Sequence, residues 1–381
     1  MILAAREPNP DAGGQILPDL PRRPGSGFCG AKFRPFVDRM PPFPAKVCRK
    51  AAVAPVLACC LALSGCAGFF GGASAEEYFA IGMAYFEIGQ SRAANRERYF
   101  QEAEKWLERA RARDRTMSAS TYNLGLLNFE IGRFEDAMRY FKAVLARDPE
   151  NTFALRAAAY TSIRLGRLEE ADELYGRFLA LVPESADDGY NHALVLFAME
   201  RYAEAQEVLE RNRLALFENA DFLLLFARVR HRQEQPEAID SYASWLTQYA
   251  DAEGSTPVAR VRFEYAEALE RWEQYAKAVE ELRRALEELR PGETNPSRQR
   301  LRFSLARLLL IADQNNPEGL AGMREAVQEG FSDFDAIEAL AKDPKIRAED
   351  RDKLTAIATE GRRAAQTVEV KEPEPEPEDG E

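Results

Sequence analysis

The sequence contains very few of the side chains from which metal and thiol sites are built. Its 381 residues include only 2 histidines, His192 and His231, and 5 cysteines, none of which lies beyond Cys66. Residues 67–381 therefore offer no disulfide among themselves and no thiolate metal site. Two histidines are also too few for a zinc or di-iron centre built from imidazole groups. We expect no metal and no cofactor.

An excess of basic charge is also missing, as are phosphate-binding loops. The formal net charge is −12, whereas nucleic-acid-binding domains are usually basic, so no nucleic-acid partner is expected. Neither G-x-x-x-x-G-K nor G-x-G-x-x-G occurs, and neither histidine has a serine or cysteine nucleophile in an elbow nearby. The sequence predicts no small-molecule substrate and no catalytic residues, and an enzyme with an unrecognised site is a remote alternative.

Long hydrophobic runs are absent too. The charge-free stretch AAVAPVLACCLAL, residues 51–63, has 13 residues, while a membrane-spanning helix needs about 20. It follows a basic cluster, Lys46, Arg49 and Lys50, and it precedes the small residues Ser64 and Gly65 and then Cys66. This order is typical of a secretory signal. The alternative is a buried apolar helix with a chance cysteine.

The stretch LSGC, which ends at Cys66, resembles the lipobox of bacterial lipoproteins. The resemblance implies cleavage before Cys66, lipid on its sulfur and a periplasm-facing chain held in the cell envelope. Ala67 follows instead of the aspartate that retains some lipoproteins in the inner membrane, which favours the outer membrane. Counted from Met40, the signal peptide is residues 40–65. Residues 1–39 show no apolar periodicity, so we expect them to be untranslated or disordered, and residues 66–74 to be a tether.

The body of the chain repeats itself with a period near 34 residues. Three similar segments place Ala137, Ala171 and Ala205 at intervals of 34, and the pattern extends to Ala103, Ala238, Ala278 and Gly319. A large apolar residue follows each of these positions by four. A fixed period of this length predicts stacked supersecondary units.

Small and large residues at this spacing resemble the tetratricopeptide repeat, most closely at 118–151. In that segment Gly125 and Ala137 are expected at the crossing of two helices, and Gly132 at the end of the first helix. The resemblance covers about 75–333. It implies an all-α, right-handed superhelix of six to seven helix-turn-helix repeats, followed by C-terminal capping helices at 334–366. Another helical hairpin array is the alternative.

Some repeats depart from this pattern. The first has about nine extra residues, SRAANRERY, expected in its turn. Glu200 stands where glycine is usual, and Asn212 where a small apolar residue is usual. The carboxylate pairs Glu169–Glu170 and Glu280–Glu281 fall on second helices, which face outward in such arrays, so we expect them to be solvated. The acidic tail, 367–381, is expected to be a disordered solvated spacer, with a docking motif as the alternative.

The resemblance also implies that the first helix of each repeat lines a concave groove that binds partner segments. The asparagines Asn123 and Asn191 are expected to hydrogen-bond an extended peptide, with aromatic side chains around them. Arg156 and Arg164 are possible substitutes for the missing lysines of a charge clamp. The alternative is that several of the aromatics are core. The predicted groove comprises Tyr122, Asn123, Leu126, Phe129, Arg156, Tyr160, Arg164, Tyr190, Asn191, Leu194 and Phe197.

Together these features predict a membrane-anchored envelope lipoprotein that acts as a protein–protein interaction scaffold. Its partners would be other envelope proteins or peptides, and the membrane through the lipid on Cys66. The alternative is a subunit of an outer-membrane-protein assembly complex or a similar envelope biogenesis complex. That family resembles this chain in being a repeat lipoprotein, but it has about five repeats and no long acidic tail.

Overall fold

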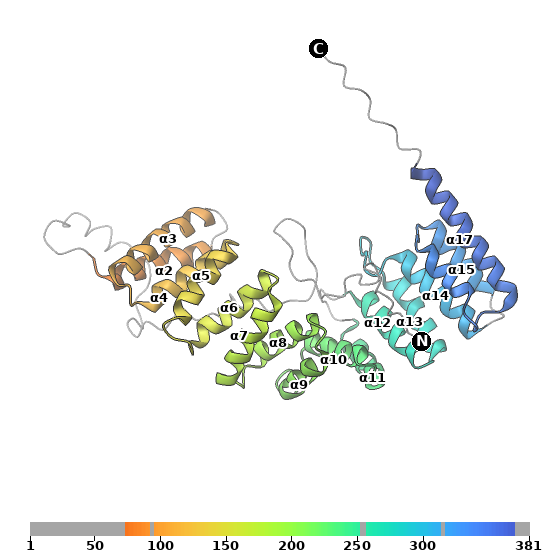
Figure 1. The fold of residues 1–381 in the computed structure, drawn as a ribbon, viewed down its shortest axis with the longest axis horizontal. Coiled ribbons are helices and arrows are strands. Elements are labelled where there is room, and N and C mark those ends of the chain that lie inside the picture. The colour runs from red at the N-terminus through yellow and green to blue at the C-terminus, as the bar shows by residue number, and fades with distance from the viewer. Residues whose placement is uncertain (1–72, 92–94, 252–256, 314–316, 370–381) are drawn as a thin grey trace, which may run out of the picture. The chain divides into compact units, whose positions relative to one another are not determined.

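The computed structural model describes residues 73–91, 95–251, 257–313 and 317–369 (Figure 1). Those residues form 16 α-helices and no strand. The predicted signal peptide, Cys66, most of the predicted tether and the end of the acidic tail lie outside them. The chain divides into two compact units, with the division after Phe217.

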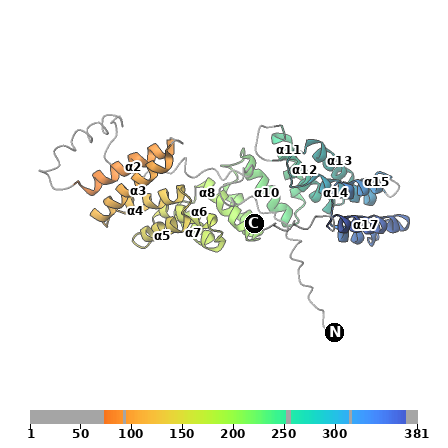
Figure 2. The ribbon, with the colours of Figure 1, turned by 90° about the horizontal axis from the view of Figure 1, so that it is seen from above.

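Unit 1 holds the first eight helices, which follow one another along the chain (Figure 2). They are α2 (Ala75–Ser91), α3 (Arg96–Arg113), α4 (Ser118–Glu130), α5 (Phe134–Leu145), α6 (Thr152–Arg164), α7 (Leu168–Leu181), α8 (Ala186–Ala198) and α9 (Tyr202–Asn212).

Unit 2 holds the other eight helices. They are α10 (Ala220–Arg232), α11 (Glu237–Tyr249), α12 (Val258–Arg271), α13 (Tyr275–Glu288), α14 (Arg298–Ala312), α15 (Pro317–Gln328), α16 (Phe334–Ala341) and α17 (Ala348–Glu369).

Within each unit the helices pack as consecutive pairs. In unit 1, α4 packs against α5 and α6 against α7, and the second helix of each pair also packs against the first helix of the next. Unit 2 repeats this order from α10 to α15. The all-α array of tetratricopeptide-type helix pairs is therefore confirmed.

Small residues allow the two helices of a pair to cross closely. A Cβ atom on Gly125 would lie 2.5 Å from the ring of Phe141, and Ala137 and Ala171 are fully buried. In the pair α8–α9 the helices also cross closely, with a glycine on the first helix and a larger residue on the second. There the larger Asn212 faces Gly189, whose added Cβ would lie 2.3 Å from the Asn212 amide nitrogen. Asn212 is thus accommodated because its neighbour has no side chain.

In several pairs the first helix ends at a residue in the left-handed conformation. Gly132 has φ of 80°, its N–H donates to Phe129 O at 3.0 Å, and the next N–H donates to Asn128 O at 2.8 Å. These are the two hydrogen bonds of a Schellman motif, which needs a left-handed residue. Gly166 repeats it with φ of 73°. Glu200 takes the same position with φ of 59°, so the motif persists without glycine.

The first pair differs from the sequence prediction. Its extra residues do not form a long turn, because α2 continues to Ser91 and α3 already begins at Arg96. Four of the nine residues, 96–99, belong to α3, whose Phe100 packs against Phe86 with ring centroids 5.6 Å apart. The insertion therefore mostly lengthens the helices.

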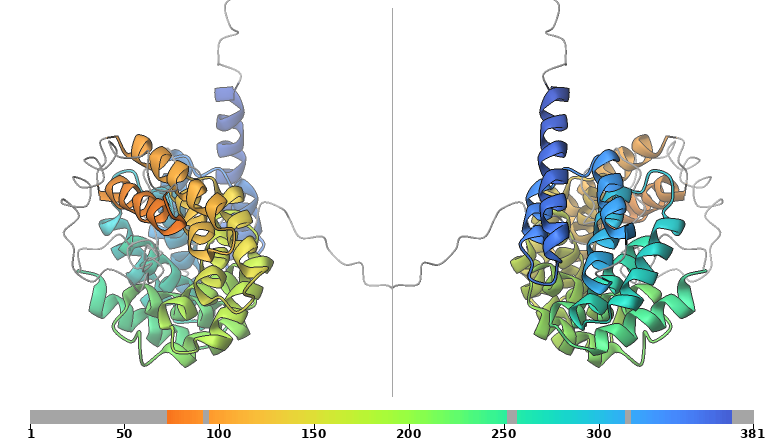
Figure 3. Two further views of the ribbon diagram at one scale, coloured as in Figure 1. Left: turned by 90° about the vertical axis from the view of Figure 1, so that its left-hand side faces the viewer. Right: turned by 90° about the vertical axis from the view of Figure 1, so that its right-hand side faces the viewer.

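The last two helices pack on the seventh pair. Ile337 of α16 and Leu354 and Ile357 of α17 are buried in one core cluster with Met323 of α15. The C-terminal part of α17 extends past the other helices of unit 2 (Figure 3) and continues to Glu369. The first three residues assigned by sequence to the tail are thus helical.

Candidate partner-binding surface

The aromatic side chains of the predicted groove pack against one another. The ring centroid of Tyr122 lies 5.7 Å from that of Phe141 and 6.3 Å from that of Phe153. Phe129 lies 5.2 Å from Phe134 and 5.4 Å from Tyr160. These contacts join neighbouring helices and neighbouring pairs. The expectation of an exposed aromatic groove is therefore wrong for these residues, because their rings fill the space between helices.

The remaining predicted groove residues of unit 1 are similarly covered. Phe197 packs on Tyr202 with centroids 5.4 Å apart, and the first helices α4, α6 and α8 are buried over most of their length. Nine of the eleven predicted residues are buried: Tyr122, Asn123, Leu126, Phe129, Tyr160, Tyr190, Asn191, Leu194 and Phe197.

Asn123 is more buried than the sequence predicted. Its amide was expected to hydrogen-bond an extended peptide, but the residue is fully buried. Its Nδ2 donates to Ala119 O at 2.9 Å within α4, while its Oδ1 has no hydrogen-bond donor among the described residues. A buried acceptor without a donor costs about 1–3 kcal/mol. Asn128, on the same helix, makes the same type of bond, to Leu124 O at 2.8 Å.

The two arginines of the predicted groove are half-buried and already interact with the array. Arg156 lies 3.6 Å from Asp188, and its guanidinium carbon lies 5.9 Å from the ring centre of Phe178. The guanidinium of Arg164 lies 4.4 Å from the centre of the Phe134 ring. Both side chains therefore stabilise packing between pairs.

His192 belongs to a polar contact between pairs. Its Nε2 lies 2.7 Å from Asp172 Oδ1, and Arg201 forms an ion pair with the same carboxylate. Burial alone would raise the pKa of Asp172, but the hydrogen bonds from His192 and Arg201 outweigh it and lower that pKa. His192 thus links α8 to α7.

The first helices of unit 2 also carry buried charges, as α8 does at Asp188. Glu264 on α12 accepts hydrogen bonds from Arg228 on α10 at 2.8 and 2.9 Å and from Arg260 at 3.1 Å. Burial opposes ionisation of Glu264, but the two arginines outweigh it and hold its pKa below the usual value. His231 lies on the same side of α10, where burial lowers its pKa.

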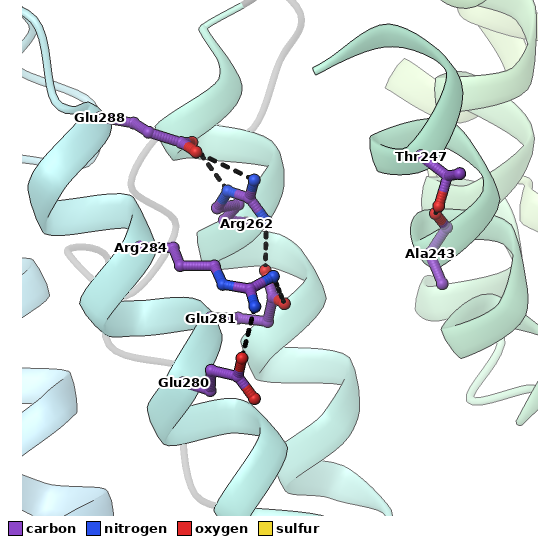
Figure 4. A network of polar contacts seen from close by, with 7 residues as sticks. All are labelled: Ala243, Thr247, Arg262, Glu280, Glu281, Arg284 and Glu288. Carbon is purple, nitrogen blue, oxygen red and sulfur yellow. Dashed lines mark hydrogen bonds and ion pairs between the residues drawn. The ribbon is translucent and has the colours of Figure 1, made fainter. Parts of the chain in front are cut away.

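A second ion-pair network joins α12 to α13 (Figure 4). Arg262 donates to Glu281 at 2.6 Å and to Glu288 at 2.7 and 2.9 Å, and Arg284 forms ion pairs with Glu281 and Glu280. The prediction that both members of the pair Glu280–Glu281 are solvated is wrong for Glu281, which is buried. Glu281 lies on the side of α13 that faces α12, where it meets Arg262.

Sequence analysis missed both ionic networks of unit 2. The available signal was the spacing of opposite charges on α12, where Arg260 and Glu264 are four residues apart and so share one face of a helix. The sequence alone did not show that Arg228 of another pair would complete the site.

Two further observations on the described residues concern membrane crossing and metal binding. Within them, no helix combines the length and the apolar character that crossing a bilayer requires. The same residues contain no group of three histidine, cysteine or acidic side chains placed to hold a metal ion.

A tetratricopeptide repeat family model matches residues 128–187, which run from the end of α4 into the start of α8. No curated protein matches the chain significantly. The fold is similar to that of a tetratricopeptide repeat protein from Parabacteroides merdae, with 16% identity, 76% of this chain and 100% of that chain covered, and a TM-score of 0.46.

Two further solved structures are similar over shorter parts. One is YrrB, described as a tetratricopeptide repeat protein with an unusual peptide-binding site, with 18% identity, 52% and 96% coverage and a TM-score of 0.43. The other is the MamA protein, with 23% identity, 45% and 91% coverage and a TM-score of 0.41. The repeats themselves define the class of this protein, which is a protein–protein interaction scaffold.

Proposed function

We propose that this protein is a lipid-anchored scaffold of the bacterial envelope, whose helix pairs bind segments of other envelope proteins. The stacked pairs, with the family match at 128–187, support the scaffold part. The order of basic cluster, apolar run, small residues and Cys66 supports the anchor and a periplasm-facing position, with the outer membrane favoured.

The binding face proposed for unit 1 is the first-helix side of α4 to α8. The observation that supports it is the buried Oδ1 of Asn123, which has no donor among the described residues. A backbone N–H of a partner segment would satisfy this acceptor and recover part of its desolvation cost. Because Asn123 is fully buried, binding requires the side chains that cover it to move apart.

The anchor is tested by Cys66→Ser. Two or more acyl chains give stable membrane anchoring, so the parent protein should partition into detergent and the variant should be released or remain an uncut precursor. The measurement is detergent phase partition with mass spectrometry of the N-terminal peptide, and Cys60→Ser is the matched control. If Cys66→Ser is processed and still partitions like the parent, the anchor proposal fails.

A further inference from the structure

Unit 2 exposes three arginines that form no ion pair with a carboxylate among the described residues. They are Arg232 at the end of α10 and Arg298 and Arg300 at the start of α14. Nearby arginines differ, since Arg228 pairs with Glu264 and Arg307 with Glu270. Arg300 instead lies with its guanidinium carbon 5.6 Å from the ring centre of Phe263. We call Arg232, Arg298 and Arg300 the arginine face.

Contacts through α12 bring the two ends of this face together. Arg228 donates to Glu264, which joins α10 to α12, and Arg307 donates to Glu270 at 2.6 Å, which joins α12 to α14. Between these two pairs lies Glu267, on which the charges of both Arg232 and Arg300 act. Arg232 on α10 and Arg300 on α14 therefore both act on one carboxylate of α12, which has no ion pair of its own among the described residues.

The chain contains an acidic segment suited to this face. Residues 371–381, KEPEPEPEDGE, carry six carboxylate side chains and one lysine. Alternating proline and glutamate cannot form a core and favour an extended chain. Such a segment can place successive carboxylates along a row of guanidinium groups, which are strong partners for carboxylates.

The described chain ends at Glu369, eight residues beyond the point where α17 passes the end of α15. A Cβ atom on Gly361 of α17 would lie 2.8 Å from Val327, near the end of α15. Arg302, in the first turns of α14, pairs with Glu325 and with Glu329 at 2.7 Å. Gly361 of α17 and Arg302 of α14 therefore both lie beside the last turn of α15. Residues 370–381 have a reach of roughly 37 Å as an extended chain, at about 3.1 Å per residue.

We propose that residues 371–381 bind across the arginine face of unit 2, with their carboxylates paired to Arg300, Arg298 and Arg232. The tail is tethered to the unit it binds, so its effective concentration reaches the millimolar range. Weak ion pairs then suffice to keep the face covered. The interaction is screened by salt because it joins charges at the surface. It does not depend on the lipid anchor.

The test compares the full chain with a chain that ends at Glu369. The probe is a labelled synthetic peptide of sequence KEPEPEPEDGE, and the measurement is fluorescence anisotropy at low and high salt. We expect the peptide to bind the shortened chain at least about tenfold more tightly than the full chain, whose own tail competes. Raising the salt to about 0.5 M should abolish binding.

Substitutions identify the surface. In the shortened chain, Arg232→Gln combined with Arg300→Gln should weaken peptide binding by about tenfold or more. Glu267→Gln should tighten it, because a nearby like charge is removed. Arg324→Gln is the matched control, since Arg324 is exposed on α15 and pairs with no carboxylate in the described part of the chain.

Three results would overturn the proposal. The first is that the shortened chain does not bind the peptide at low salt. The second is that the labelled peptide binds the full and shortened chains equally well. That result would mean that the chain's own tail does not occupy the face, and that the face binds an acidic segment of another protein. The third is an equal effect of Arg324→Gln and the double substitution, which would show general attraction to positive charge.

Discussion

At the scale of single residues, the energetically distinctive positions are buried polar groups on first helices. Glu264 is matched by two arginines, whereas the buried Oδ1 of Asn123 has no hydrogen-bond partner among the described residues. The half-buried Glu267 forms no ion pair there. Matched buried charges are sensitive to the loss of one partner. Unmatched groups instead lower stability in the free protein, and they offer an interaction to a ligand.

Glu267 predicts an effect of pH on stability. Burial raises the pKa of Glu267 to about 7, Glu264 adds to the rise, and Arg300 and Arg232 oppose it. Between about pH 4.5 and pH 7 the folded state holds a proton that the unfolded state has lost. The free energy of unfolding that this proton contributes is therefore fully present below about pH 4.5, and it is lost as the pH rises through 7. Glu267→Gln stays neutral, and it should become more stable than the parent by about 1–3 kcal/mol at pH 8.

The measurement is urea unfolding of parent and Glu267→Gln at pH 5 and pH 8. Burial lowers the pKa of His231, so this histidine makes stability rise with pH. Both proteins contain His231, and its effect therefore cancels in the difference between their stabilities. Near-equal stabilities at pH 5 and a gap at pH 8 support the assignment. A constant difference at both pH values would contradict it.

Asn123 predicts a separation of stability from binding. Asn123→Ala removes one hydrogen bond within α4 together with an unpaired acceptor, so the melting temperature should change little, while partner recovery by crosslinking in cells should fall. Asn128→Ala removes the same type of bond, and it should leave partner recovery unchanged when the two variants are compared at equal abundance. Equal recovery with both variants would show that Asn123 plays no part in binding.

At the scale of helices and turns, each pair follows one pattern with local substitutions. The left-handed residue after the first helix is glycine in two early pairs and glutamate at Glu200, Glu234 and Glu273. A left-handed non-glycine residue costs roughly 1–2 kcal/mol. These turns therefore hold a modest amount of backbone strain, which glycine would relieve.

Glu200→Gly tests this directly, because no described residue pairs with the Glu200 side chain. The variant should be more stable by about 0.5–1 kcal/mol, since relief of the left-handed strain exceeds the added flexibility of glycine in the unfolded chain. Gly166→Ala is the reciprocal change and should destabilise. Both are measured by thermal and urea unfolding. A destabilised Glu200→Gly would mean that the turn is not strained in solution.

The sequence predicted the helix pairs well because the crossing positions impose a strict rule of size. Gly125, Ala137 and Ala171 lie at tight crossings as their spacing indicated. The groove was predicted poorly because a first-helix residue can face a partner or a neighbouring pair, and periodicity does not distinguish these. Tyr122 contacts Phe153 of the next pair, and Glu264 meets Arg228 from another helix. Both contacts depend on how pairs stack.

At the scale of the whole molecule, the two units carry different first-helix faces. The first helices of unit 1 carry packed aromatic rings, one unpaired amide oxygen and the Arg156–Asp188 ion pair, whereas those of unit 2 carry larger ion-pair networks and the arginine face. A stacked array is stabilised mainly by contacts between neighbours, so one chain can hold two faces of different chemistry. We expect unit 1 to bind segments by backbone hydrogen bonds and apolar contact, and unit 2 to bind acidic ones.

The central claim is that partners bind on the first-helix side of the array in the envelope. The most direct measurement places a photo-crosslinking residue at Arg164, which is half-buried on the first helix α6, and separately at Arg139, which is exposed on the second helix α5. The same protein is labelled in intact cells with Cys66 unchanged. The account predicts a discrete set of envelope-protein adducts from position 164 and far fewer from position 139. Adducts from position 139 alone, or the same adducts from both positions, would contradict it.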